Sequence, residues 1–196
     1  MERKITYFEE SRPENTEIAL QLARERAAEL GIGRIVLAST TGTTALRAMD
    51  VFKESKIKLV VVPHQFDFKR KKNLFPEETI AVLRAAGHAV HFGTMLFHTG
   101  ELYGSTTPMV MANLLRCFSQ GVKVCFEIVL MAADAGLVTC GERVIAVAGT
   151  GRGADTALVM QAASSQNLKH LRVNEILCKP LNPINIDEAL QMIKPE

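Results

Sequence analysis

Hydroxyl-bearing residues crowd one short segment of the chain. The run Ser39-Thr-Thr-Gly-Thr-Thr44 follows Arg34–Ala38, an apolar run typical of a buried strand, and leads into a helical pattern over Thr43–Lys53. Gly42 would let the backbone turn tightly and approach a ligand closely, and the amides that begin a helix attract an anion. An ordinary helix cap does not explain five hydroxyls within six residues. We therefore predict a phosphate-binding loop made of Ser39, Thr40, Thr41, Gly42, Thr43 and Thr44.

A second glycine-rich run follows another apolar strand pattern. Gly149-Thr-Gly-Arg-Gly-Ala-Asp-Thr156 comes after Arg143–Ala148, and we expect a helix over Asp155–Ser165. Arg152 has a planar guanidinium suited to phosphate. The spacing of the glycines in this run matches neither the dinucleotide fingerprint nor a P-loop. The alternative is a glycine-rich turn with a solvated arginine. We predict that the rest of the ligand is held by Gly149, Thr150, Gly151, Arg152, Gly153, Asp155 and Thr156.

Polar residues also follow two further strand patterns. His64 and Gln65 come just after Lys58–Val62, and Thr94 comes just after His88–Phe92. Because parallel strands end at one edge of their sheet, these side chains would lie beside the two loops and could contact the ring of a ligand. The alternative is that they belong to ordinary polar loops.

Charged residues interrupt the apolar segment Val122–Ala135, which we interpret as a buried helix. Charged side chains on so apolar a helix should be paired or face a cavity. Lys123 and Glu127 are four residues apart and could form an internal ion pair. The other interpretation is that both, together with Asp134, form a charged wall of the ligand pocket.

The positions of these residues depend on strands that alternate with helices, which predicts a parallel sheet covered on both faces. We expect a three-layer α/β sandwich whose mostly parallel sheet has about five strands, and the direction of the last strand is left open. The expected strands are Arg34–Ala38, Lys58–Val62, His88–Phe92, Arg143–Ala148 and Val173–Cys178, with Thr6–Phe8 as an additional edge strand. The expected helices are Asn15–Leu30 with Asn15 as its cap, Thr43–Lys53, Pro76–Ala86, Thr107–Gln120, Val122–Ala135, Asp155–Ser165 and Ile186–Ile193. We expect a long loop over Gly93–Thr106.

Length and composition limit the classes of protein that fit. The 196 residues suit one domain, residues 1–196, and the net charge of +2 does not indicate a nucleic-acid partner. No apolar run approaches the length of a membrane helix, and the start of the chain has no apolar export signal. The four cysteines have no metal-site spacing, so we predict no metal. Because no export signal is seen, we also predict reduced thiols and a cytoplasmic location.

Several motifs together resemble a known family. Ile35–Ala45 is similar to the strand and loop that hold the effector sugar phosphate in the C-terminal domain of pyruvate kinases, and Val144–Ala157 resembles a later strand and turn of that domain. The resemblance is closer to stand-alone, mostly prokaryotic proteins that consist of this domain. It covers nearly the whole chain, including Asn15-Thr16, Glu25–Ala27, Val62–His64, Gly121–Val124, Glu127-Ile128, Met131–Gly136 and Gly151–Thr156.

The resemblance implies a ligand rather than a reaction. It covers none of the catalytic barrel of pyruvate kinases, so we expect no phosphoryl transfer to pyruvate, and no other reaction is identified. It implies flavin mononucleotide (FMN), with the phosphate in the first loop, the ribityl or ring portion at Gly149–Thr156, and the ring near His64 and Gln65. The alternative is a non-enzymatic sensor of a sugar phosphate or nucleotide. The resemblance and the apolar segment Val122–Ala135 also favour a homo-oligomer.

Overall fold

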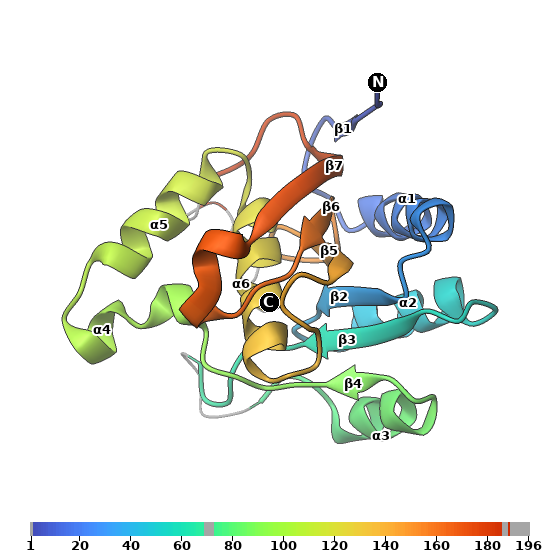
Figure 1. Cartoon of the computed structure of the whole chain (residues 1–196), viewed down its shortest axis with the longest axis horizontal. Coiled ribbons are helices and arrows are strands. Elements are labelled where there is room, and N and C mark those ends of the chain that lie inside the picture. Colours follow the sequence, from blue (N-terminus) through green and yellow to red (C-terminus); the bar gives the residue numbers. More distant parts are fainter. Residues whose placement is uncertain (1, 69–72, 186–187, 189–196) are drawn as a thin grey trace.

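Apolar, β-branched runs form the central sheet. The computed structural model describes residues 2–68, 73–185 and 188, and over these residues seven strands pair in the order β1-β7-β6-β5-β2-β3-β4 (Figure 1). The strands are β1 Thr6–Phe8, β2 Arg34–Ala38, β3 Lys58–Val62, β4 Ala89–Val90, β5 Arg143–Ala148, β6 Thr156–Gln161 and β7 Arg172–Pro180. All neighbours are parallel except that β6 runs antiparallel to β5 and β7. The predicted, mostly parallel sheet is confirmed, including its edge strand β1.

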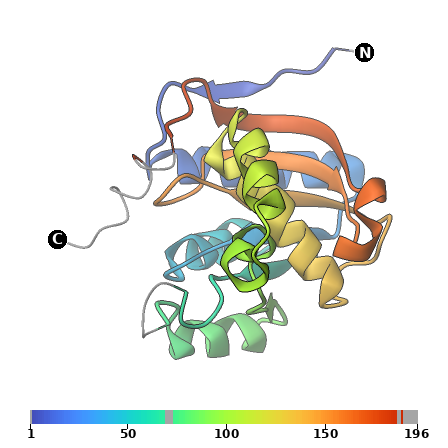
Figure 2. The same ribbon diagram turned by 90° about the vertical axis from the view of Figure 1, so that its left-hand side faces the viewer.

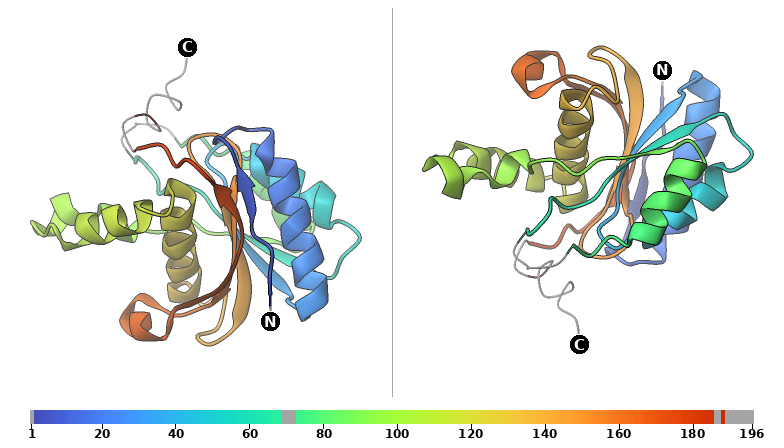
Figure 3. Two further views of the ribbon diagram at one scale, coloured as in Figure 1. Left: turned by 90° about the horizontal axis from the view of Figure 1, so that it is seen from above. Right: turned by 90° about the horizontal axis from the view of Figure 1, so that it is seen from below.

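Helices cover both faces of this sheet, so the predicted three-layer sandwich is confirmed. One face carries α1 (Asn15–Leu30), α2 (Thr43–Phe52) and α3 (Glu77–Ala85). The other face carries α6 (Gln120–Asp134), and α5 (Thr107–Arg116) lies on the outer side of α6 with the short α4 (Gly100–Tyr103) beyond it (Figure 3). Two short 3-10 helices, η1 (Leu96–His98) and η2 (Ser165–His170), lie on the α6 side.

Alternation of side chains within each strand builds a core on both faces. In β2, Ile35 and Leu37 pack toward α1, α2 and α3, whereas Val36 between them packs toward α6. All three are fully buried, which is why β2 reads as a continuous apolar run rather than as an alternating one. The same pattern recurs in β3 and β5. The sequence signal for these strands was strong because both of their faces are covered.

The helix predicted over Asp155–Ser165 is wrong. The chain instead turns back from β5 into β6, with Ala148 opposite Thr156 and Val144 opposite Met160. All residues of β6 except its last are buried, so both sides of the segment contact core. A short apolar run of this kind is compatible with a buried strand and with a buried helix, and its pattern could not separate them.

Other boundaries also differ from expectation. Asn15 is the first residue of α1 rather than its cap, and its side chain donates a hydrogen bond to the Glu10 carbonyl (2.8 Å). The helix expected over Thr107–Gln120 ends at Arg116, because Ser119 caps the next helix by accepting the Val122 amide (3.0 Å). The segment Gly93–Thr106 contains η1 and α4 rather than only loop, and β4 is shorter than expected. The helix expected over 186–193 lies outside the described residues.

The four cysteines carry free thiols. Cys125 and Cys178 are buried, and burial raises the pKa of the Cys178 thiol to about 12. Burial raises the pKa of the Cys125 thiol as well, so both buried thiols are protonated and unreactive at neutral pH. No helix in the described part of the chain combines the length and the apolarity that crossing a bilayer requires.

Candidate functional site

Parallel pairing places the two predicted loops side by side. Leu37 of β2 is opposite Val147 of β5, and Ala38 is opposite Val62 of β3. The residues that follow these strands, among them Ser39 and Gly149, therefore meet at the carboxyl edge of the sheet. Figure 2 shows the same edge turned by 90° from Figure 1. The first requirement for a shared ligand site, that both loops lie on one edge, is met.

The first loop turns sharply at Gly42. Its φ is 88°, and a Cβ at this position would lie 3.2 Å from Thr79 Cγ2 in the first turn of α3. The left-handed backbone strongly favours glycine here, and the tight approach to α3 adds to that preference. The Ala45 amide, in the first turn of α2, donates to Ser39 Oγ (3.3 Å), and the amides of the first two residues of α2 have no acceptor within the helix.

The hydroxyls of the first loop divide into two groups. Ser39 and Thr44 are buried and belong to the framework of the loop. Thr41 and Thr43 are exposed, with their Oγ1 atoms 3.3 Å apart, and Thr40 is half-buried. The exposed pair lies at the start of α2, where the helix end carries partial positive charge. This arrangement offers donors to an anion without needing a charged side chain.

The second loop is closed by its own carboxylate. Asp155 Oδ2 accepts the Thr150 amide (3.1 Å), and Asp155 Oδ1 accepts the Thr156 hydroxyl (2.7 Å). Burial raises the pKa of the Asp155 carboxyl, and the hydrogen bonds from Thr156 and Thr150 oppose the shift. The buried Ser11 hydroxyl also lowers the pKa of the Asp155 carboxyl. Its distance or angle lies outside those of a normal hydrogen bond, and it forms none with any other described residue. Because a strand follows, no helix begins in this loop, and Arg152 is exposed at its outer turn.

Two other helices begin at the second loop instead. In α1, Thr16 Oγ1 accepts the Ala154 amide (2.9 Å), and Gly153, at φ 76°, fits against the Pro13 backbone beside it. At the start of α6, a Cβ on Gly121 would lie 2.6 Å from Thr156 Cβ. Neither contact can be predicted from the sequence, because only the three-dimensional fold brings these helix starts to the loop.

The loops after β3 and β4 are tied together. Gln65 Oε1 accepts the Met95 amide (2.9 Å), so the predicted residue Gln65 fixes one loop to the other. His64 is half-buried and packs edge-on against Phe68, with ring centroids 5.2 Å apart. Thr94 is exposed at the same edge. All three predicted residues therefore lie where the carboxyl edge meets the α6 side of the sheet.

A buried cluster of charged residues lies next to these loops. Lys123 Nζ donates to Glu127 Oε2 (2.5 Å) and lies 3.0 Å from His98 Nε2, while Glu127 Oε1 accepts the Phe97 amide (2.9 Å). Burial lowers the pKa of Lys123, and the Glu127 charge opposes this. His98 packs edge-on against Phe68, with ring centroids 4.9 Å apart, so aromatic contacts connect the cluster to His64.

Of the two interpretations of the charged helix, the internal ion pair is the one that the geometry supports. Asp134 takes no part in the cluster, because it is exposed and accepts the Ser165 amide (2.7 Å). His98, the neighbour that completes the cluster, comes from η1, and no spacing in the sequence could connect it to α6.

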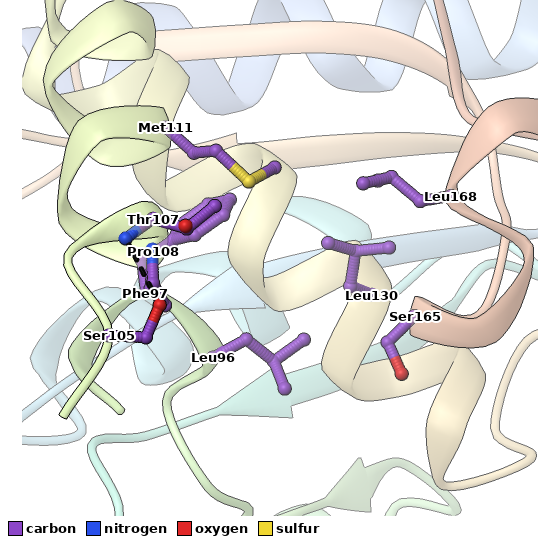
Figure 4. A pocket seen from close by; sticks show the side chains of 9 residues that line it. All are labelled: Leu96, Phe97, Ser105, Thr107, Pro108, Met111, Leu130, Ser165 and Leu168. Atoms are coloured by element: carbon purple, nitrogen blue, oxygen red, sulfur yellow. Dashed lines mark hydrogen bonds between the residues drawn. The ribbon is translucent and has the colours of Figure 1, made fainter. Parts of the chain in front are cut away.

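Phe97, whose ring centroid lies 5.3 Å from Lys123 Nζ, also lines an apolar pocket of about 270 Å³ (Figure 4). Leu96, Met111, Leu130 and Leu168 point into it from η1, α5, α6 and η2. It contains none of the predicted phosphate-binding residues, so it is separate from the two loops.

The fold and the edge loops together define a class of protein: an α/β domain with hydroxyl- and glycine-rich loops at the carboxyl ends of its central strands. Within this class, the chain belongs to the pyruvate kinase, alpha/beta domain family, whose sequence model matches residues 17–160. The family predicted by resemblance is thereby confirmed.

Solved pyruvate kinases from Cryptosporidium parvum are among the similar structures. One matches with 17% identity and a TM-score of 0.43 over 76% of this chain. A second, in complex with ADP, has the same three values, and a third has 18% identity and a TM-score of 0.37 over 68% of this chain. The matches cover 23%, 24% and 21% of those pyruvate kinase chains, so this chain spans less than a quarter of their length.

Proposed function

We propose that this domain binds a phosphate-bearing small molecule, flavin mononucleotide, at the carboxyl edge of its sheet. The phosphate would sit at the first turn of α2. The exposed hydroxyls of Thr41 and Thr43 and the first amides of α2 would donate hydrogen bonds to its oxygens.

The geometry around Gly42 is the observation that carries this proposal. With φ at 88° and only a tight space for a Cβ beside Thr79, the loop brings bare backbone to the helix start and leaves Thr41 and Thr43 exposed. A loop that served only to cap α2 would need Ser39 alone, since Ser39 already accepts the Ala45 amide.

The neighbouring loops suggest how the rest of the ligand would lie. Arg152, exposed on the adjacent loop, could place its guanidinium against the phosphate or the ribityl chain. His64 and Thr94, on the other side of the first loop, would border the ring. Asp155 and Thr156 are buried in hydrogen bonds of their own loop, so they would shape the site rather than touch the ligand. A bound flavin would supply redox chemistry, and the protein would supply binding and orientation.

Titration of the purified protein with FMN, riboflavin and a set of sugar phosphates tests the proposal. FMN should bind, and riboflavin, which lacks the phosphate, should bind at least roughly 10-fold more weakly, as expected for the loss of hydrogen bonds to a charged group. The double variant Thr41→Val/Thr43→Val should weaken FMN binding by a similar factor. Thr139→Val, an exposed site before β5 at the opposite edge, should leave the affinity unchanged.

The outcomes separate the rival ligands. Equal affinity for FMN and riboflavin would remove the phosphate from the proposal. Stabilisation by a sugar phosphate or nucleotide without flavin binding would favour the sensor. Arg152→Ala, with Lys56→Ala at the amino edge as its charge-matched control, should weaken whichever phosphate ligand binds. If the Thr41/Thr43 and Arg152 variants left all ligand responses unchanged, the edge loops would have no binding role.

A further inference from the structure

Helices α4 and α5 present an apolar surface away from the sheet. They lie outside α6, and in Figure 3 they extend from the body of the domain. Within α5, all of whose residues are described, only Ala112 is buried. Six large apolar side chains of this region are between 50 and 76% exposed, and we call them the α4–α5 face: Leu102, Tyr103, Met109, Val110, Leu114 and Phe118.

Helical spacing makes part of the α4–α5 face a continuous stripe. Val110, Leu114 and Phe118 follow one another at intervals of four residues, which places them along one side of α5 and its C-terminal turn. Gly104–Leu115 contains no charged residue. The helices on the other side of the sheet differ in this respect, since the surface of α1, for example, carries Glu25.

The nearest cation is turned back from this stripe. Arg116 donates from Nε to Gln120 Oε1 (2.8 Å) and from Nη1 to Asn113 Oδ1 (2.7 Å). These bonds hold the guanidinium along its own helix. The stripe of Val110, Leu114 and Phe118 is therefore apolar along its length, whereas solvent-exposed helix faces usually carry mixed charge.

A second copy of this chain fits the α4–α5 face in size and in chemistry. With ordinary side-chain areas, the six residues expose roughly 700 Å², close to the ~800 Å² that each partner buries in a standard interface. The apolar stripe of α5 would leave a charged partner group unpaired and desolvated, whereas the same stripe of a second copy brings no such group. In a dimer with two-fold symmetry, each copy contributes the same apolar stripe to the contact.

We propose that the α4–α5 face is the contact surface of a symmetric dimer, in which α5 of one copy packs against α5 of the second. This interface lies on the outer side of α6, away from α1, α2 and α3. The apolar segment 122–135 favoured self-association in sequence, but α6 is largely buried and cannot itself be the contact surface.

Sedimentation equilibrium of the full chain tests the dimer. The wild-type protein should have the mass of a dimer, and Val110→Asp/Leu114→Asp should raise the dissociation constant more than about 100-fold, because burying carboxylates in an apolar contact is costly. Val82→Asp changes a similarly exposed side chain on α3 and should leave the dimer intact. Far-UV circular dichroism identical to wild type would show that the variants are folded.

Two exposed cysteines give an independent readout. Cys117 lies beside the stripe, whereas Cys140 lies in the turn before β5. A short bis-maleimide should link two copies in the Cys140→Ser variant but not in the Cys117→Ser variant. A monomeric wild-type protein would overturn the proposal, as would a Val110/Leu114 variant that assembles as the wild type does. A monomer that binds neutral lipid vesicles through this face would assign it to a membrane surface instead.

Discussion

Replacing Lys123 by methionine should destabilise the domain strongly. The side chains of Lys123 and Glu127 are only 1% and 2% exposed, so the variant leaves a carboxylate in the core without its cation. Methionine is close to lysine in length and can occupy the same buried space beside Phe97. The change therefore removes charge with little change in volume.

The structure sets the size of the effect. Breaking a buried ion pair by removing one partner costs about 3–5 kcal/mol, because the remaining charge stays desolvated. The double variant Lys123→Met/Glu127→Gln should recover most of this loss. The amide introduced by Glu127→Gln would keep an oxygen for the Phe97 amide, which Glu127 Oε1 now accepts. The double variant should then lie within about 1 kcal/mol of wild type, roughly the net worth of one hydrogen bond.

Urea denaturation followed by far-UV circular dichroism measures these differences, since the chain has no tryptophan to report by fluorescence. With an m-value of about 2 kcal/mol/M, the single variant should shift the midpoint by roughly 2 M and the double variant by less than roughly 0.5 M. The double-mutant cycle isolates the interaction between the two side chains.

Two results would refute this account. A loss of less than about 1 kcal/mol in the free energy of unfolding of Lys123→Met would mean that water reaches the ion pair and that it behaves as an exposed pair. A double variant as unstable as the single would mean that Lys123 stabilises the fold through His98 and Phe97 rather than through Glu127.

Two further predictions concern backbone fit and pH. Gly153→Ala should lower the melting temperature by several degrees, because φ is 76° and the new Cβ would lie 2.9 Å from Pro13 Cα. Gly33→Ala, which has open space around its Cβ, should have little effect. Equal shifts of the melting temperature of both variants in calorimetry would contradict this reasoning. The pKa of His88 is lowered by burial and by Lys58, and its Nδ1 accepts a β3 amide (3.3 Å). The unfolded chain therefore binds a proton that the folded chain does not, so stability should fall as pH drops through the ordinary histidine pKa, about 6.5. Urea titrations from pH 8 to 5 should show a smaller decline in His88→Asn, and parallel curves for the two proteins would exclude this role.

The strands were predictable from the sequence where local pattern and burial agree. Arg34–Ala38 and Lys58–Val62 are β-branched runs buried on both faces, and each begins and ends where expected. The first loop was equally visible, because Gly42 and its hydroxyls stand between a strand signal and a helix signal.

The rest depended on contacts between distant residues. The local sequence pattern of β6 fits a buried helix as well as a buried strand. The segment is a strand because it pairs antiparallel with β5 and β7. Asp155 was expected to begin a helix, but its carboxylate closes its own loop. Lys123 and Glu127 could be paired by spacing, yet His98 could not be added. The exposed side of α5 follows from where the fold places that helix, and its apolar sequence alone would equally suit a buried one.

The position of β7 in the sheet has a consequence for biosynthesis. β1 pairs only with β7 among the described strands, and Arg26 of α1 forms an ion pair with Glu175 of β7 (2.6 Å). The first strand to be translated therefore has no partner until the last described strand has been made. During translation the edge of β6 and the outer part of the α1 layer stay uncovered. This domain should thus complete its fold only once β7 has been synthesised, and the nascent chain before that point is the species most exposed to aggregation.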